Sequence, residues 1–233
     1  MNTNTDMHLL GHNKSVDWIR PLIDHTLLTA QATEQQVDVH MQEAIDLGLS
    51  AVCLRPNMIP ADTRGLRIVT VCGFPSGAHD PAVKAIEATL ALARGADDID
   101  MVVGLGTVKA HDWDAVRNDI RSLRNVVPTS KVLKVIIESA VLTDDEIVAC
   151  CQIGQELGVD YMKTSTGYHP AGGASLAHVT LMSSILDDRV QLKASGGIRT
   201  LAQATAFLDA GASRLGVSNT RALLAGIDAN AEY

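Results

Sequence analysis

Residues 95–103 read Gly-Ala-Asp-Asp-Ile-Asp-Met-Val-Val, and this stretch carries the pattern that decides the fold. Gly95 stands where a left-handed residue closes a helix, and a strand-like run begins three residues later. Because side chains alternate between the two faces of a strand, Ile99 faces one side and Asp100 the other. The stretch therefore predicts a strand, over 98–103, with an apolar face toward a layer of helices and a carboxylate on the opposite face.

The same pattern recurs after three other glycines, at positions 48, 158 and 211. In each case the fourth residue after the glycine is apolar and the fifth is not a bulky aliphatic residue. The apolar members of the four pairs are Val52, Ile99, Met162 and Leu215, and their partners are Cys53, Asp100, Lys163 and Gly216. Two further segments show the same alternation, with Lys134, Ile136 and Glu138 opposite Leu133, Val135 and Ile137, and with Gln191, Lys193 and Ser195 opposite Leu192 and Ala194.

Short apolar runs alternate with longer amphipathic stretches between residues 21 and 224, which is typical of βα units. The amphipathic stretches begin with N-cap signals, such as Thr33 with Gln36, Thr143 with Glu146, and Asp80 before a proline. The eight expected strands are 21–27, 51–55, 68–73, 98–103, 132–138, 161–165, 190–194 and 214–217. We expect an α/β protein with a single-domain (β/α)8 TIM barrel over 20–226, an extension or short helix at 1–19 and a tail at 227–233.

An open, doubly wound sheet is the alternative fold. Its strands are covered by helices on both faces, so both faces usually read as apolar. In this chain one face carries charged residues, which favours the barrel: Asp100, Lys134, Lys163 and Lys193.

Composition excludes several classes of protein. The 233 residues are 46% hydrophobic, which is enough for a sizeable core. A net charge of -8 and an aromatic content of 3% argue against binding to nucleic acid or to an anionic membrane surface. We find no secretory signal pattern and no membrane-spanning apolar run, and the cysteines (53, 72, 150 and 151) suit neither a disulfide framework nor a zinc site. We therefore expect a cytoplasmic protein with reduced thiols and no metal.

Lysines on the inward face of predicted strands indicate chemistry, because a buried amine is costly and a neutral amine can form a Schiff base. Lys163 ends a strand and is followed by small polar residues that leave room for a carbonyl substrate. Lys193 has the matching position on the next strand, and its charge would lower the pKa of Lys163. Asp100 could then move protons while it pairs with Lys193 or Lys134. A structural network of ion pairs is the alternative interpretation.

Two glycine-containing segments follow the last two predicted strands, Ser-Gly-Gly at 195–197 and Gly-Val-Ser-Asn at 216–219. Each precedes a predicted helix, and barrels often bind phosphate at these two loops through backbone N–H groups and a helix N-terminus. Tight turns with positive φ are the alternative. Cys53, at an inward strand end, could contact substrate or could simply fill space.

Motifs in order over about 200 residues then carry a family resemblance: IDHTLL (23–28), AVC (51–53), VCGFP (71–75), GADDIDMV (95–102), LKVIIE (133–138), KTSTG (163–167), KASGGIRT (193–200) and GASRLG (211–216). On these motifs the chain resembles the deoxyribose-phosphate aldolases, which are class I aldolases that use no metal. The resemblance implies a TIM barrel without a cofactor. It also implies reversible cleavage of 2-deoxy-D-ribose 5-phosphate to acetaldehyde and D-glyceraldehyde 3-phosphate, in deoxyribonucleotide catabolism.

The resemblance also implies a role for individual residues. Lys163 would form the Schiff base, Lys193 would perturb its pKa, and Asp100 would belong to the proton relay. Other positions would line the substrate site (Asp24, Cys53 and Lys134) or bind phosphate (Gly167, Gly196, Gly197, Gly216 and Ser218). Some members use a C-terminal tyrosine in proton transfer, which makes Tyr233 a candidate, with a frayed terminus as the alternative. Family habit suggests a homodimer.

The chain departs from the usual family pattern at MVVGLG (101–106), at GVS (216–218), and at Arg55 and Asn57. Gly104 replaces a polar side chain near the site and Val217 replaces a hydroxyl near the phosphate, so substrate range or rate is expected to change. Two other functions stay open: a Schiff-base barrel aldolase for a different phosphosugar, and a non-catalytic phosphosugar-binding protein. The intact pair of lysines with Asp100 argues against the second. The chain shows no resemblance to enzymes that bind pyridoxal phosphate.

Overall fold

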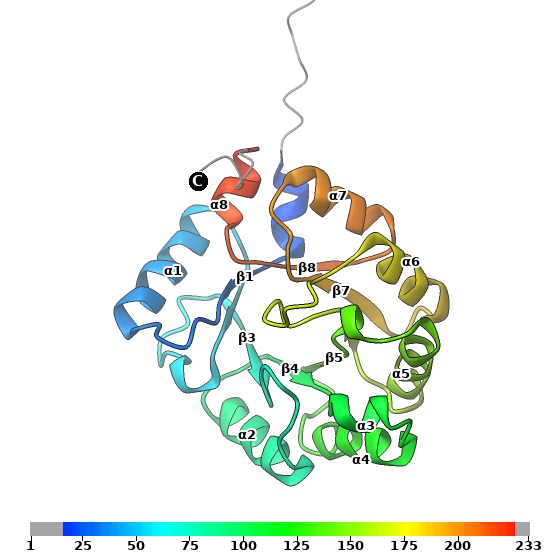
Figure 1. Cartoon of the computed structure of the whole chain (residues 1–233). Helices are drawn as coiled ribbons and strands as arrows, with labels where there is room; N and C mark the ends of the chain where they lie inside the picture. Colours follow the sequence, from blue (N-terminus) through cyan, green and yellow to red (C-terminus); the bar gives the residue numbers. More distant parts are fainter. Residues whose placement is uncertain (1–15, 227–233) are drawn as a thin grey trace, which may run out of the picture.

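The computed structural model describes residues 16–226, and its centre is a closed barrel of eight parallel strands (Figure 1). Each strand pairs with the next, and β8 closes the ring on β1, where Asp24 lies opposite Gly216. The strands are β1 (Ile23–Leu27), β2 (Ala51–Leu54), β3 (Arg67–Cys72), β4 (Asp98–Val102), β5 (Val132–Ile136), β6 (Tyr161–Lys163), β7 (Gln191–Ser195) and β8 (Arg214–Val217). The predicted (β/α)8 barrel is confirmed, and the predicted strands agree with these bounds to within two residues.

Helices surround the strands on the outside of the barrel, as Figure 1 shows. They are α1 (Glu34–Asp46), α2 (Pro81–Ala93), α3 (Leu105–Lys109), α4 (Trp113–Arg124), α5 (Asp144–Glu156), α6 (Leu176–Ile185), α7 (Leu201–Asp209) and α8 (Thr220–Leu224). Short 3-10 segments are η1 (Asp17–Leu22), η2 (Pro56–Met58) and η3 (Ser139–Val141). The predicted helix starts are confirmed, because Thr33 and Thr143 form capping boxes and Asp80 caps α2.

The connection between β2 and β3 differs from the expected regular βα unit. It contains only η2, whereas two helices, α3 and α4, follow β4. Pro56 and Pro60 both lie in this connection, over residues 55–66. Proline donates no backbone hydrogen bond and disfavours the helical conformation in the residue before it. A segment this short with two prolines therefore does not form an α-helix.

Two layers of side chains fill the molecule. The apolar members of the four sequence pairs (Val52, Ile99, Met162 and Leu215) belong to the large core between strands and helices, as predicted. Inside the barrel a smaller apolar cluster surrounds Cys53. The interior also holds six charged residues that are each at most 3% exposed: Asp24, Asp98, Asp100, Lys134, Lys163 and Lys193. Burial of so many charges is unfavourable unless they are paired, so their contacts need an account.

All four cysteines are buried and free, and Cys150 and Cys151 lie within α5. Within residues 16–226, no helix has the length and apolar character needed to cross a membrane. Most of the predicted extension at 1–19, the predicted tail at 227–233 and the candidate Tyr233 lie outside the described residues. Those domain limits and the role of Tyr233 stay predictions.

Candidate active site

Asp100, on β4, is the centre of the charged interior. Its Oδ2 accepts hydrogen bonds from Nζ of Lys163 at 2.9 Å and from Nζ of Lys193 at 2.8 Å. Its Oδ1 accepts a hydrogen bond from Nζ of Lys134 at 2.8 Å. The strand register explains this convergence, since Asp100 lies opposite Lys134, and Lys163 opposite Lys193. The three residues predicted to be catalytic are therefore in direct contact.

Two further carboxylates surround this centre. Asp24, on β1, accepts a hydrogen bond from Lys193, and Asp98 accepts one from Lys134 at 2.5 Å. Arginines at the starts of two strands complete the cluster, Arg67 beside Asp98 and Arg214 beside Asp24. With every group ionised, three lysines and two arginines face three carboxylates. One lysine can therefore lose its proton without leaving a carboxylate unpaired.

The lysines respond differently to these surroundings. Burial lowers the pKa of Lys163, and the charge of Lys193 lowers it further, so that it ends below its ordinary value although Asp100 opposes the change. Burial also disfavours the charged forms of Lys193 and Lys134, but the carboxylates outweigh it and raise the pKa of both. Burial opposes ionisation of Asp100, yet the three ammonium groups hold its pKa well below the usual range. Lys163 is the amine of this cluster that most readily becomes a neutral nucleophile.

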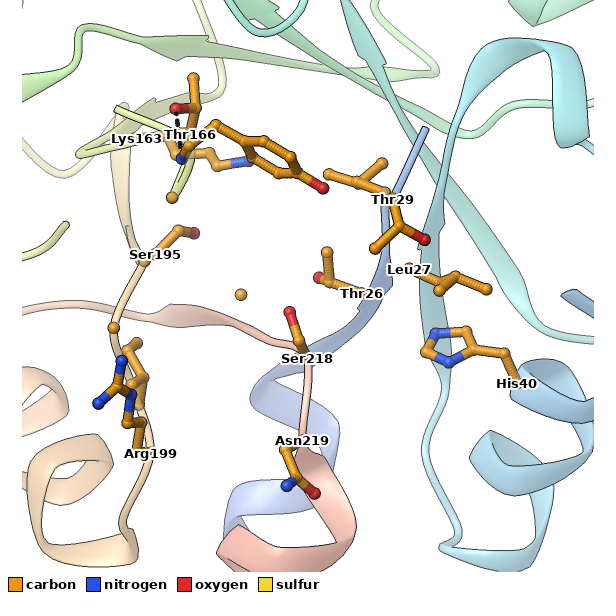
Figure 2. Close-up of a pocket in the computed structure, with 17 residues that line it drawn as sticks. Thr26, Leu27, Thr29, His40, Lys163, Thr166, Ser195, Arg199, Ser218 and Asn219 are labelled. Carbon is orange, nitrogen blue, oxygen red and sulfur yellow. Dashed lines mark hydrogen bonds between the residues drawn. The ribbon is translucent and has the colours of Figure 1, made fainter. Parts of the chain in front are cut away.

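A cavity of about 750 Å³ contains Lys163 in its wall (Figure 2). The same wall contains all five residues predicted to bind phosphate: Gly167, Gly196, Gly197, Gly216 and Ser218. Lys163 donates a hydrogen bond to Asp100, and Lys193 donates one to the same oxygen, so Asp100 and Lys193 both lie next to the amine in the cavity wall. The segments after β6, β7 and β8 that were expected at one site therefore border one cavity. Phosphate binding there stays a prediction.

Asp24, Cys53 and Lys134 are expected to line the substrate site, and all three are buried in the barrel interior. Their contact with substrate stays a prediction. Asp24 and Lys134 are each engaged by ionic partners in the interior. Cys53 packs among apolar residues, and burial raises the pKa of its thiol to about 11, although the charges of Lys193 and Lys163 act to lower it. Cys53 therefore lies between an apolar cluster and the two lysines, and both interpretations of this cysteine stay open.

Close contacts with neighbouring segments explain why glycines occupy the wall of the cavity at positions 196 and 216. Gly196 has a φ of 86°, and a Cβ there would lie 3.0 Å from Cα of Gly173 and 3.1 Å from Cα of Gly167. A Cβ on Gly216 would lie 2.5 Å from Oγ of Ser195. Side chains are therefore excluded from this region, which leaves the backbone free to approach an anion.

The wall also contains residues that the sequence analysis did not single out: Thr26, Leu27, Leu28, Thr29, His40, Thr166, Tyr168, Ile198, Arg199 and Asn219. Figure 2 shows Lys163 and Thr166 together on one side, with Arg199, Ser218 and Asn219 on another. Arg199 brings a cation to the side of the cavity that holds the glycine loops, and its place two residues after the Gly-Gly pair was a usable signal. His40 gave no signal, because it lies in the middle of an amphipathic helix.

Among the described residues, His25, His40 and Glu43 bring possible metal ligands within 4.8 Å of one another. The two imidazoles are stacked, with centroids 3.7 Å apart and planes inclined by 10°. The ring lone pairs of such a stack run side by side instead of converging, which does not suit a tetrahedral zinc ion. Burial lowers the pKa of His25 to about 3 and also lowers that of His40. The two imidazoles are therefore best described as a neutral stack between β1 and α1.

The fold and its amine-bearing, glycine-lined cavity are those of a barrel aldolase. The chain belongs to the DeoC/LacD family of aldolases, whose family model matches residues 20–226. It is 50% identical over 208 residues to the deoxyribose-phosphate aldolase of Kocuria rhizophila, which covers 89% of this chain and 95% of the relative. It is 48% identical over 220 residues to that of Mycobacterium marinum, with 92% and 97% covered.

Solved structures agree with this assignment. The tetrameric deoxyribose phosphate aldolase of Aeropyrum pernix superposes with a TM-score of 0.82 at 30% identity, covering 89% of each chain. The aldolase QR15 superposes with a TM-score of 0.83 at 33% identity, covering 92% of this chain and 96% of the other.

Proposed function

We propose that this chain cleaves 2-deoxy-D-ribose 5-phosphate reversibly to acetaldehyde and D-glyceraldehyde 3-phosphate, through a Schiff base on Lys163. The observation that carries the proposal is the position of Lys163, an amine of lowered pKa in the wall of a cavity that also contains the glycine-rich loops. Relatives that are about 50% identical carry the name deoxyribose-phosphate aldolase, which supports the choice of substrate.

The reaction begins when the neutral amine of Lys163 attacks the C1 aldehyde of the open-chain sugar and water leaves. The resulting protonated imine is an electron sink. The C3 hydroxyl loses its proton, the C2–C3 bond breaks, and its electron pair moves toward the imine nitrogen. Glyceraldehyde 3-phosphate leaves as the first product. Protonation of the remaining enamine at C2 and hydrolysis of the imine release acetaldehyde and restore the amine.

Asp100 and Lys193 would move the protons of these steps, through water. Lys193 keeps its own charge because its pKa is raised, and that charge favours the neutral form of Lys163. Asp100 touches both amines through one oxygen, so it can respond to a change of charge on either. The two lysines therefore have separate roles, one as nucleophile and one as a permanent cation.

The glycine loops, with Ser218 and Arg199, would bind the phosphate far from the reacting carbons. Binding at a distance holds C1 in register with Lys163 and supplies energy for the chemical step. The reaction needs no metal or cofactor in this scheme. A role in deoxyribonucleotide catabolism, a cytoplasmic location and assembly as a homodimer belong to the same proposal.

The test measures aldehyde release from several sugar phosphates in parallel. The purified chain is incubated with 2-deoxyribose 5-phosphate, ribose 5-phosphate or fructose 1,6-bisphosphate. Glyceraldehyde 3-phosphate, which cleavage of any of the three would release, is measured through triosephosphate isomerase and an NADH-dependent glycerol-3-phosphate dehydrogenase, and acetaldehyde is measured separately through alcohol dehydrogenase. We expect both products with the first substrate alone and neither with the Lys163→Met control. Cleavage of a different phosphosugar would overturn the substrate assignment, and binding without cleavage would support the non-catalytic alternative.

A further inference from the structure

Glu138, which follows β5, contacts the loop after β6 from within the fold. It is 1% exposed. Its carboxylate accepts a hydrogen bond from Oγ1 of Thr166 at 2.5 Å and from the backbone N–H of Thr166 at 3.3 Å. Within the described part of the chain, these two groups of one residue are its hydrogen-bond donors. The carboxylate is therefore committed to a single point of the neighbouring loop.

The backbone of Glu138 is strained at this point, with φ 55° and ψ 55° in the left-handed region. A residue with a Cβ adopts this conformation at a cost, whereas glycine adopts it freely. The turn also lets the N–H of Ser139 donate to the carbonyl oxygen of Thr164 at 2.8 Å. Strain of this kind gathers at functional sites, where the surrounding contacts maintain it.

Thr166 stands between two functional positions, three residues after Lys163 and one before Gly167, and it lines the cavity (Figure 2). Its hydroxyl proton points to Glu138, because the carboxylate is the acceptor of that hydrogen bond. One lone pair of the same oxygen accepts the N–H of Tyr168 at 3.0 Å. A hydroxyl oxygen has two lone pairs, so one is left for a donor in the cavity.

We propose that Glu138 is a positioning residue that acts through Thr166. It orients the Thr166 oxygen as an acceptor for a hydroxyl group of the phosphosugar, and it holds the loop that carries Gly167. The inference rests on the function proposed above and deepens it. Acetaldehyde has neither a hydroxyl nor a phosphate, so its reaction with Lys163 does not use this contact.

A double-mutant cycle with two readouts tests the proposal. The variants are Glu138→Gln, Thr166→Val and their combination, with Thr166→Ser as a matched control that keeps the hydroxyl. The first readout is kcat/KM for cleavage of 2-deoxyribose 5-phosphate. The second is the rate at which borohydride traps acetaldehyde on Lys163.

We expect each single variant to lower kcat/KM about ten- to hundredfold, the range for one hydrogen bond to a charged group. Trapping of acetaldehyde should change by less than about twofold. The kcat/KM of the double variant should be no lower than that of the less active single variant, because the effects of contacts in series are not additive. Thr166→Ser should stay close to the unmodified chain.

Parallel losses in both readouts would overturn the proposal, because they would mean that Glu138 only supports the fold. Losses that multiply in the double variant would also overturn it, because Glu138 would then act independently of Thr166. If Glu138→Gln does not fold, Thr166→Val and Thr166→Ser decide: a large difference in kcat/KM supports the proposal and equal activity contradicts it. An unmodified chain that traps acetaldehyde but leaves the sugar phosphate intact would overturn the proposed function itself.

Discussion

Replacement of Lys193 by methionine removes a positive charge that faces Lys163 across one oxygen of Asp100. The two Nζ atoms lie 2.9 and 2.8 Å from that oxygen, so their separation is at most about 5.7 Å. At an effective dielectric constant of about 20, two unit charges at this distance repel by about 3 kcal/mol, which corresponds to about two pKa units. The loss of Lys193 also leaves Asp24 and Asp100 with one cation fewer, and this favours a proton on Lys163 as well.

We therefore expect the pKa of Lys163 to rise in Lys193→Met, by about two pH units, and its neutral fraction at neutral pH to fall by up to about a hundredfold. The assay is the rate of acetaldehyde trapping by cyanoborohydride on Lys163, measured from about pH 6 to about pH 10. The midpoint of the acid limb should move upward by about two units, and the rates of the two proteins should converge at high pH. Lys193→Arg keeps a cation and should leave the midpoint close to that of the unmodified chain.

One result would refute this reasoning. If Lys193→Met reacts slowly at every pH while the midpoint moves by less than about half a unit, Lys193 acts through contact and not through charge. Circular dichroism of both variants establishes that they fold, so that a general loss of structure is not mistaken for a loss of charge.

Three further predictions concern other parts of the chain. Gly196→Ala places a Cβ 3.0 Å from Cα of Gly173. The KM for the sugar phosphate should therefore rise about tenfold, while the rate of acetaldehyde trapping stays the same. An unchanged KM would argue against phosphate binding at this loop. The pKa of His25 is lowered to about 3 in the folded chain, from its ordinary value of 6.5. Between these two pH values the unfolded chain binds one more proton at His25 than the folded chain does, so the free energy of unfolding falls as the pH falls from 6.5 to about 3. His25→Asn keeps a polar group for Thr220 and should remove a loss on the order of 5 kcal/mol, measured by urea unfolding. Parallel pH curves for both proteins would contradict this. Truncation before Tyr233 should slow solvent exchange of the acetaldehyde methyl protons, and an unchanged exchange rate would exclude a role for this residue.

The strands could be predicted because each part of the pattern has a local cause. The glycines at 48, 95, 158 and 211 have positive φ and close helices, which sets the start of the following strand. Alternation then assigns each side chain to the helical layer or to the interior. The connection between β2 and β3 was predicted wrongly as part of a complete βα unit. The prediction did not take into account that two prolines in so short a segment prevent an α-helix.

Alternation gives the face of a strand but not the depth of a side chain inside a closed barrel. Depth depends on the stagger between strands, which is a property of the closed sheet. For this reason Lys134, Lys163 and Lys193 could be assigned to the interior, whereas alternation does not show which of them reaches the cavity wall. The contact between Glu138 and Thr166 joins two loops 28 residues apart, and no periodic pattern reports such a contact.

The most direct test of the central claim is reduction of the chain with borohydride in the presence of 2-deoxyribose 5-phosphate, followed by mass mapping of its peptides. We expect an ethyl group on Lys163, because cleavage leaves a two-carbon fragment on the amine, and no such adduct in Lys163→Met. A folded chain that carries no adduct on any lysine, or carries it on a different lysine, would contradict the assignment of Lys163 as the Schiff-base residue.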